Sequence, residues 1–147
     1  MRTGPDFIYR RIAEGSAPEY AMKKAVACAA QHPVTVARAR ALGVPITAGS
    51  DSGSPGAPHP ALFRELHDLV SRGQLTPLEA ISAGTTTNAR ALGLDSEIGT
   101  IRPGLQADLL IVDGDPTQDI GQLERPWSVL QAGQWIRRET AAPLAEN

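Results

Sequence analysis

The stretch Gly-Val-Pro-Ile-Thr-Ala-Gly-Ser-Asp-Ser-Gly, residues 43–53, is the most informative part of the chain. Residues 44–48 are mostly apolar and have helical patterns on either side, which predicts a parallel strand buried on both faces. Ligands of α/β sheets bind at the carboxyl ends of strands, so Asp51 is a candidate for catalysis or metal binding. Gly49 and Gly53 allow a sharp turn and leave room for a ligand. Alternatively, Asp51 only caps the next helix or forms an Asx turn.

Composition limits the possible classes of protein. A chain of 147 residues with 41% hydrophobic and 20% charged residues suits about one soluble domain. The 14 basic and 16 acidic side chains give no basic surface for nucleic acid. No apolar run approaches the ~18 residues of a membrane-spanning helix, and none near the start suggests a secretory signal. The single cysteine, Cys28, indicates a reducing, cytoplasmic compartment, and its Ala-rich surroundings predict a small buried core residue.

The first two thirds of the chain carry helical patterns. Two helices are expected over residues 20–30 and 34–42, separated at His32-Pro33, with Gly43 closing the second in a left-handed cap. After a Pro-rich loop, a third helix has an apolar stripe made by Leu62, Phe63, Leu66, Leu69 and Val70. Thr76-Pro77-Leu78-Glu79 is a capping-box pattern that begins a helix to about Leu92, with a polar break at residues 85–88.

The pattern becomes extended after Gly99. We expect a turn at residues 101–104, a buried strand at 107–112 and a hairpin whose strands are joined by Ala132-Gly133. The tail after Arg138 is expected to be frayed. These changes predict a domain boundary near Asp95, with residues 1–95 as α/β material and residues 96–147 as a small β unit.

Five motifs follow one another in a specific order. They are Gly-Val-Pro-Ile-Thr-Ala-Gly-Ser-Asp (43–51), Phe-Arg-Glu-Leu (63–66), Leu-Thr-Pro-Leu-Glu-Ala-Ile (75–81), Thr-Thr-Asn-Ala-Arg-Ala-Leu-Gly-Leu (86–94) and Ile-Gly-Thr-Ile-Arg-Pro-Gly-Leu-Gln-Ala-Asp-Leu-Leu-Ile-Val-Asp-Gly-Asp-Pro (98–116). Over residues 32–137 this order resembles the C-terminal third of the metal-dependent amidohydrolase superfamily. It is most similar to the branch of imidazolonepropionase-like enzymes and Xaa-Pro dipeptidases.

The resemblance implies an α/β fold, with the C-terminal part of a (β/α)8 barrel in residues 1–95 and part of a small β-sandwich in residues 96–147. It implies a hydrolase of carbon–nitrogen bonds that uses a divalent metal, zinc being expected, and a small amide, cyclic amide or dipeptide substrate. Asp51 matches the aspartate that ends the eighth barrel strand, which binds the metal and carries a proton between the attacking water and the leaving nitrogen. His59 either contacts substrate or is a solvent-facing loop histidine.

The family's other metal ligands, a His-x-His pair, a carboxylated lysine or glutamate and two later histidines, have no match in this sequence. A full barrel takes roughly 250 residues, so the chain is interpreted as a truncated product or fragment. By itself it is expected to be marginally stable and inactive. It would aggregate, form an oligomer or associate with a missing N-terminal part, because a parallel strand needs neighbours on both edges.

Two rival functions belong to other classes. The run Asp51-Ser52-Gly53-Ser54-Pro55 is similar to the nucleophile region of chymotrypsin-like proteases, but those are β-barrels and this run lies among helices. Residues 49–53 also fail to match the Gly-x-Ser-x-Gly pattern of a nucleophilic serine, because the middle residue is Asp51. The second rival is a non-catalytic remnant that binds another chain through an exposed barrel edge.

Overall fold

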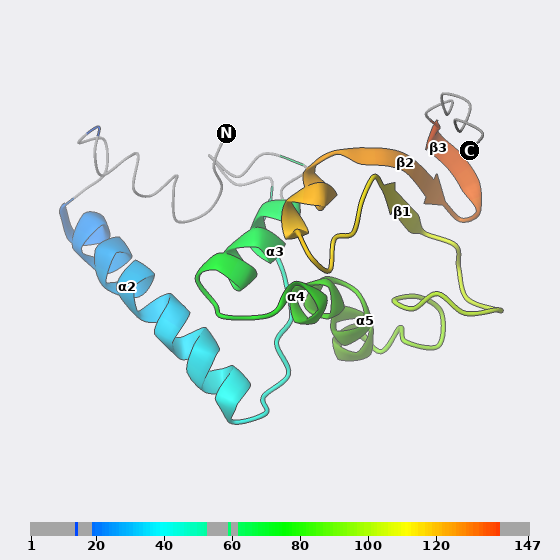
Figure 1. Cartoon of the computed structure of the whole chain (residues 1–147). Helices are drawn as coiled ribbons and strands as arrows, with labels where there is room; N and C mark the ends of the chain where they lie inside the picture. Colours follow the sequence, from blue (N-terminus) through cyan, green and yellow to red (C-terminus); the bar gives the residue numbers. More distant parts are fainter. Residues whose placement is uncertain (1–13, 15–18, 53–58, 60–61, 139–147) are drawn as a thin grey trace.

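The structure, a computed structural model, describes residues 14, 19–52, 59 and 62–138. Within these residues a long helix is followed by three shorter helices and then by a small antiparallel sheet (Figure 1). The elements are α2 (Glu19–Ala41), α3 (Leu62–Ser71), α4 (Pro77–Gly84), α5 (Thr86–Leu92), β1 (Leu109–Val112), the 3-10 helix η1 (Ile120–Glu124), β2 (Pro126–Gln131) and β3 (Gln134–Arg138). No described helix combines the length and the apolar character needed to cross a bilayer.

Helix α2 continues through Pro33, so the predicted break at His32-Pro33 is wrong. Proline removes one backbone donor, but His32 and Thr35 are exposed, so water can reach the backbone of this turn. The Thr35 hydroxyl also donates to the carbonyl oxygen of Gln31, at 3.0 Å. A single helix thus passes the position where the sequence predicts two.

Cys28 is exposed, which corrects the expectation of a buried core residue. The alanines around it predict burial only if both ends of α2 pack against the protein. In the structure the C-terminal half supplies the packed residue Val36, while side chains such as Val26 remain half exposed. The N-terminal half of α2 therefore presents Cys28 to solvent.

The end of α2 follows its prediction. Gly43 has a φ of 70°, and its N–H donates to the carbonyl of Arg40, at 3.0 Å. The N–H of Val44 donates to the carbonyl of Ala39, at 3.0 Å. Together these bonds make a Schellman motif, in which glycine takes the left-handed position without a steric penalty.

The core lies between α3, α4 and η1. Leu66 and Leu69 of α3 are buried, as the apolar stripe predicts, whereas Leu62 is 39% exposed. They pack with Leu75 and with the small residues Ala80 and Ala83 of α4. Ile120 of η1 joins the same cluster and so ties the C-terminal part of the chain to the helices. The boundary near Asp95 stays a prediction.

The helix start at Thr76 and the break after α4 both follow local sequence. Thr76 accepts a hydrogen bond from the N–H of Glu79, and the Glu79 carboxylate accepts from the N–H of Thr76, which confirms the capping box. Helix α4 ends at Gly84 and α5 begins at Thr86, inside the predicted polar break. The hydroxyl of Thr86 donates to the carbonyl of Gly99, at 2.7 Å, which anchors the start of α5.

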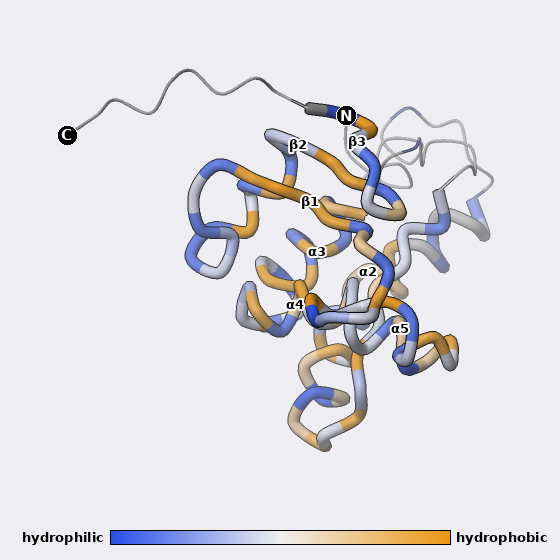
Figure 2. The backbone as a smooth tube through the Cα atoms, turned by 90° about the vertical axis from the view of Figure 1, so that its right-hand side faces the viewer, coloured by the Kyte–Doolittle hydropathy of each residue, from blue (hydrophilic) through white to orange (hydrophobic). Residues whose placement is uncertain are grey.

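The sheet has the order β1-β2-β3 with antiparallel pairing throughout. Ala132 and Gly133 join β2 to β3, which confirms the predicted hairpin, and their φ values of 49° and 76° are typical of a type I′ turn. The turn at residues 101–104 is also confirmed, with Gly104 at a φ of 90°. Hydrophobic stretches run along β1 and part of β2 (Figure 2).

Residues 44–48 are extended, but no strand is assigned to them, which corrects the predicted parallel strand. A strand requires a paired neighbour, and none of the described strands pairs with this segment. The segment passes between the helices instead (Figure 1). Ile46 packs against the core and Ala48 is 7% exposed, but Val44 is 50% exposed, so the expected burial on both faces is also wrong for most of the segment.

Candidate functional site

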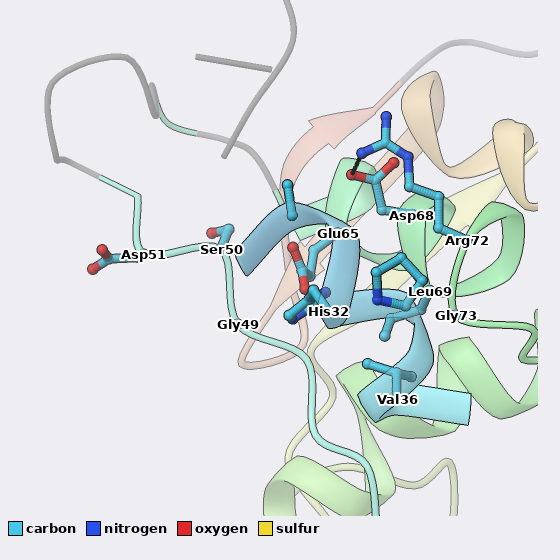
Figure 3. Close-up of a pocket in the computed structure, with 12 residues that line it drawn as sticks. His32, Val36, Gly49, Ser50, Asp51, Glu65, Asp68, Leu69, Arg72 and Gly73 are labelled. Carbon is cyan, nitrogen blue, oxygen red and sulfur yellow. Dashed lines mark ion pairs between the residues drawn. The ribbon is translucent and has the colours of Figure 1, made fainter. Parts of the chain in front are cut away.

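Asp51 lies near the end of the extended segment, after the buried residue Ala48. The side chain is exposed, and in Figure 3 its carboxylate points away from the side chains of His32 and Glu65. Helix α3 begins only at Leu62, which leaves Asp51 outside the positions that cap that helix locally. The assignments of Asp51 as a catalytic residue and as a metal ligand remain predictions.

The turn at this site differs from the one expected from the glycines. Asp51 itself is left-handed, with a φ of 47°, while Gly49 is not among the residues of positive φ. A Cβ at Gly49 would meet no atom within 4 Å, so the space beside its backbone is open, as predicted. Ser50 and Ser52 share a hydrogen bond between their hydroxyl oxygens, at 2.6 Å, which closes the turn around Asp51. Aspartate tolerates this backbone conformation better than most residues.

Asn88 of α5 holds the backbone immediately before the site. Its side-chain nitrogen donates to the carbonyl oxygen of Ala48, at 2.8 Å, and its side-chain oxygen accepts from the N–H of Ala48, at 3.2 Å. The same N–H also lies 3.2 Å from the carbonyl oxygen of Ala83 in α4. The amide of Asn88 thus satisfies the two backbone groups that a neighbouring strand would otherwise pair.

A groove of about 260 Å³ lies beside the site, between α2 and α3. It is lined by Ala29, His32, Pro33, Val36, Gly49, Ser50, Asp51, Glu65, Asp68, Leu69, Arg72 and Gly73. Figure 3 shows that most of its ionisable side chains come from two helices, with His32 on α2 and Glu65, Asp68 and Arg72 on α3, whereas Asp51 lies on the turn. A long ion pair of 3.8 Å joins Arg72 to Asp68.

Glu65 is the most perturbed group of this groove. The sequence places it on the wet side of α3, but the structure makes it half-buried because α2 lies across it. Burial raises the pKa of the Glu65 carboxyl, the negative charge of Asp68 raises it further, and His32 opposes them. A carboxyl of this kind can hold a proton closer to neutrality than an exposed glutamate can.

The second predicted site residue, His59, is exposed. It is not among the residues that line the groove beside Asp51. Residues 53–58 and 60–61 lie outside the described part of the chain. Among the described residues, no group of three or more histidine, cysteine, aspartate or glutamate side chains could hold a metal ion. Asp51 therefore offers one carboxylate, and the described residues alone do not fit a metal site.

Two features of the site, the contact made by Asn88 and the groove, were not predicted from the sequence. Asn88 is in a polar stretch to which we assigned only capping or packing, and its contact with Ala48 joins residues 40 positions apart. The groove was missed because Glu65 was expected to face solvent and His32 was expected only to cap or pack at a helix boundary. The only early signal for Asn88 is that its motif follows the Asp51 motif in a fixed order.

Comparisons with known proteins show which proteins this chain is similar to. Residues 14–137 match the sequence profile of the amidohydrolase family. The chain is 36% identical over 109 residues to ochratoxinase of Aspergillus niger, which covers 71% of this chain and 22% of that protein. It is 41% identical over 80 residues to imidazolonepropionase of Cereibacter sphaeroides strain KD131, which covers 54% of this chain and 20% of that protein.

The chain is also similar to solved structures. A crystal structure of a Xaa-Pro dipeptidase with methionine bound in its active site matches with a TM-score of 0.78 at 28% identity. That match covers 89% of this chain and 32% of the dipeptidase chain. The chain thus spans about a fifth of the length of the curated relatives and about a third of the solved one.

Proposed function

Since this chain belongs to the amidohydrolase family, we propose that it contributes Asp51 as the catalytic acid–base group of a metal-dependent hydrolase of carbon–nitrogen bonds. The observation that supports this most directly is the placement of Asp51 on an exposed turn beside a groove, three residues after Ala48, which is buried and hydrogen-bonded to Asn88. A general base needs such a combination of an accessible carboxylate and a fixed backbone.

The proposed role of Asp51 is to accept a proton from the attacking water and return it to the departing nitrogen. Both transfers use the same carboxylate, so asparagine at this position could perform neither. A divalent metal, zinc being the one we expect, would supply a water that ionises near neutral pH. The described residues provide one candidate ligand, Asp51, and the whole site would need further ligands.

The proposed substrates are small amides, with Xaa-Pro dipeptides first and cyclic amides second. This order follows the solved relatives, which include the Xaa-Pro dipeptidase and a prolidase complexed with N-methylphosphonate-L-proline. The ionisable side chains His32, Asp68 and Arg72 around the groove suit a substrate that carries both an amino and a carboxylate group. We place the residues up to about Asp95 in the C-terminal part of the barrel and residues 96–147 in the sandwich.

The test compares hydrolysis by the longest in-frame gene product that contains residues 1–147 with hydrolysis by the 147-residue chain. Methionyl-proline and an N-acyl amino acid are supplied with and without added zinc. We expect turnover by the longer product only, and a loss of kcat of roughly 10²–10⁴-fold in Asp51→Asn. The control, Ser52→Ala, removes the neighbouring hydroxyl and should keep most activity. Full activity of Asp51→Asn would refute the role of Asp51.

A second candidate is a non-catalytic module that binds another chain. The chain presents several large apolar side chains to solvent, including Ile101 at 85% and Leu42 at 70% exposure, which favours association. Size-exclusion chromatography with light scattering separates the two candidates for the 147-residue chain. A binding module should form one defined complex, whereas an incomplete enzyme should give heterogeneous aggregates.

A further inference from the structure

We propose that Asn88 is a positioning residue that fixes the peptide groups of Ala48 and thereby sets the direction in which the chain presents Asp51. The contact has two points, because the Asn88 side chain donates to the Ala48 carbonyl, at 2.8 Å, and accepts from the Ala48 N–H, at 3.2 Å. The two bonds reach the two peptide groups on either side of the Ala48 Cα. The Ala48 N–H is also bonded to the Ala83 carbonyl, at 3.2 Å, so the bond to the Ala48 carbonyl is the one that Asn88 alone supplies among the described residues.

The clamp is needed because residues 44–50 have no strand partner in the described part of the chain. In a sheet, the ladder of hydrogen bonds holds each strand in its orientation. Here the burial of the Ala48 side chain, at 7% exposure, fixes where the segment lies. The Asn88 amide adds what burial cannot provide, which is a defined rotation of the backbone.

Asn88 is itself held on a rigid support. It lies in the first turn of α5, where Thr86 donates its hydroxyl hydrogen to the carbonyl of Gly99, at 2.7 Å. The next residue, Ala89, is 2% exposed and packs so closely on Gly99 that a Cβ there would lie 2.5 Å from the Cβ of Ala89. These contacts fix the start of α5 and so fix the amide that holds Ala48.

The distance along the chain from the clamp to the carboxylate is short. Only Gly49 and Ser50 separate Ala48 from Asp51, and the hydrogen bond between Ser50 and Ser52, at 2.6 Å, closes the turn. Asp51 also has a φ of 47°, a conformation that persists when the surroundings over-determine it. A rotation at Ala48 would therefore reach Asp51 through two residues, Gly49 and Ser50.

The catalytic half of this inference rests on the proposed function. If Asp51 transfers a proton, a small displacement of its carboxylate should lower kcat, because proton transfer depends on alignment. The groove that would receive substrate is formed by α2 and α3 and does not include Asn88. Loss of Asn88 should therefore change kcat much more than KM.

The proposed contact between Asn88 and Ala48 can be tested without measuring enzymatic activity. Hydrogen-exchange mass spectrometry on the longest in-frame gene product follows peptides that cover residues 44–52 in wild type, Asn88→Ala, Asn88→Asp and Thr87→Ala. Thr87→Ala is the matched control, because it shortens a side chain in the same turn of α5 and keeps the amide. We expect about tenfold faster exchange of this segment in Asn88→Ala and no change in the control. Exchange should also be faster in Asn88→Asp, which keeps an acceptor for the Ala48 N–H but replaces the donor with a charged oxygen facing the Ala48 carbonyl.

The proposed effect of Asn88 on catalysis is tested by measuring kcat and KM of the same variants and of Asp51→Asn. We expect Asn88→Ala to lower kcat about tenfold or more at similar KM, and the double variant to be no slower than Asp51→Asn alone. If Asn88→Ala unfolds the protein, Asn88→Asp serves for both measurements. Unchanged exchange over residues 44–52 in the folded Asn88 variants would overturn the proposal. Faster exchange together with full activity of Asp51→Asn would instead refute the catalytic role and leave the clamp standing.

Discussion

The guanidinium of Arg40 contacts both carboxylate oxygens of Glu79. Its Nη2 lies 2.8 and 2.9 Å from the two oxygens, and its Nε lies 3.0 and 3.2 Å from them. This pair joins the last turn of α2 to the first turn of α4. The same carboxylate accepts from the N–H of Thr76, at 2.7 Å, so one side chain both caps α4 and holds α2 beside it.

The pair predicts a specific dependence of stability on pH. The backbone N–H of Thr76 and then Arg40 lower the pKa of Glu79 to about 2, from an ordinary value of 4.5. Because the pKa of the folded state is the lower one, this stabilisation is present above about pH 4.5 and is lost as the pH falls towards 2. Both side chains are more than 40% exposed, so solvent screening limits the gain to about 1 kcal/mol or less.

Urea unfolding of wild type and Glu79→Gln at several pH values between 7 and 2 measures this effect. We expect the variant to be less stable at pH 7 and the difference to shrink towards pH 2. Glu124→Gln, at an exposed carboxylate in η1, is the control and should show a much smaller difference. A difference between wild type and Glu79→Gln that stays constant with pH would contradict the assigned role of the ion pair.

Gly99→Ala should destabilise the chain more than Gly104→Ala. Both glycines have φ near 90°, which costs an alanine about 1 kcal/mol at either position. Only at Gly99 would the new Cβ also meet a neighbour, the Cβ of Ala89 at 2.5 Å, whereas the space at Gly104 is open. We expect Gly99→Ala to cost about 1–3 kcal/mol more than Gly104→Ala in urea unfolding, the typical cost of overpacking. Equal losses would mean that α5 moves away at no cost.

Features set by neighbouring residues could be predicted from the sequence. The capping box at Thr76, the left-handed cap at Gly43 and the hairpin turn at Ala132-Gly133 each depend on a few adjacent residues. Residues 44–48 could not be assigned correctly, because their pattern describes a strand and its partner is not among the described residues. The pattern also predicts burial on both faces, which holds only at Ala48, and it cannot report which group satisfies the backbone.

In the candidate site, too, features set by adjacent residues could be predicted, and features set by distant contacts could not. Asp51 could be singled out from the apolar run before it, and its role at the site stays a prediction. Asn88 could not, because its partner Ala48 is distant in the sequence and the contact involves backbone groups that no residue type reveals. The burial of Glu65 was missed for a similar reason, since it depends on how α2 crosses α3.

Asp108→Ala should weaken the hairpin. The Asp108 carboxylate accepts from the N–H of Ala132, at 2.7 Å, and from the side chain of Gln106, at 2.8 Å. The first bond supports Ala132 at its φ of 49°, an unfavourable conformation for alanine. We expect a loss of about 1–3 kcal/mol in urea unfolding, as for a hydrogen bond to a charged group. Asp113→Ala, at an exposed carboxylate just after β1, is the control and should have little effect.

Leu69→Ala should destabilise the core by about 2–5 kcal/mol, the usual cost of removing a buried leucine side chain. Leu69 is 4% exposed and lies in the cluster with Ala80, Ala83 and Ile120. Leu92→Ala is the control, because that leucine is 70% exposed at the end of α5 and should lose under about 1 kcal/mol. Similar losses in both variants would show that the described core does not dominate the stability of the chain.

Cys28 gives a direct test of the exposed half of α2. The thiol is exposed in the structure, so a reagent such as 5,5′-dithiobis(2-nitrobenzoate) should modify it without denaturant. We expect one thiol per chain to react, at a rate close to that of a short cysteine peptide, and no reaction in Cys28→Ser. Reaction only after denaturation would mean that something covers this half of α2 in solution. Dilution then distinguishes the causes, because a second copy of the chain would dissociate and expose the thiol, whereas burial within one chain would not change.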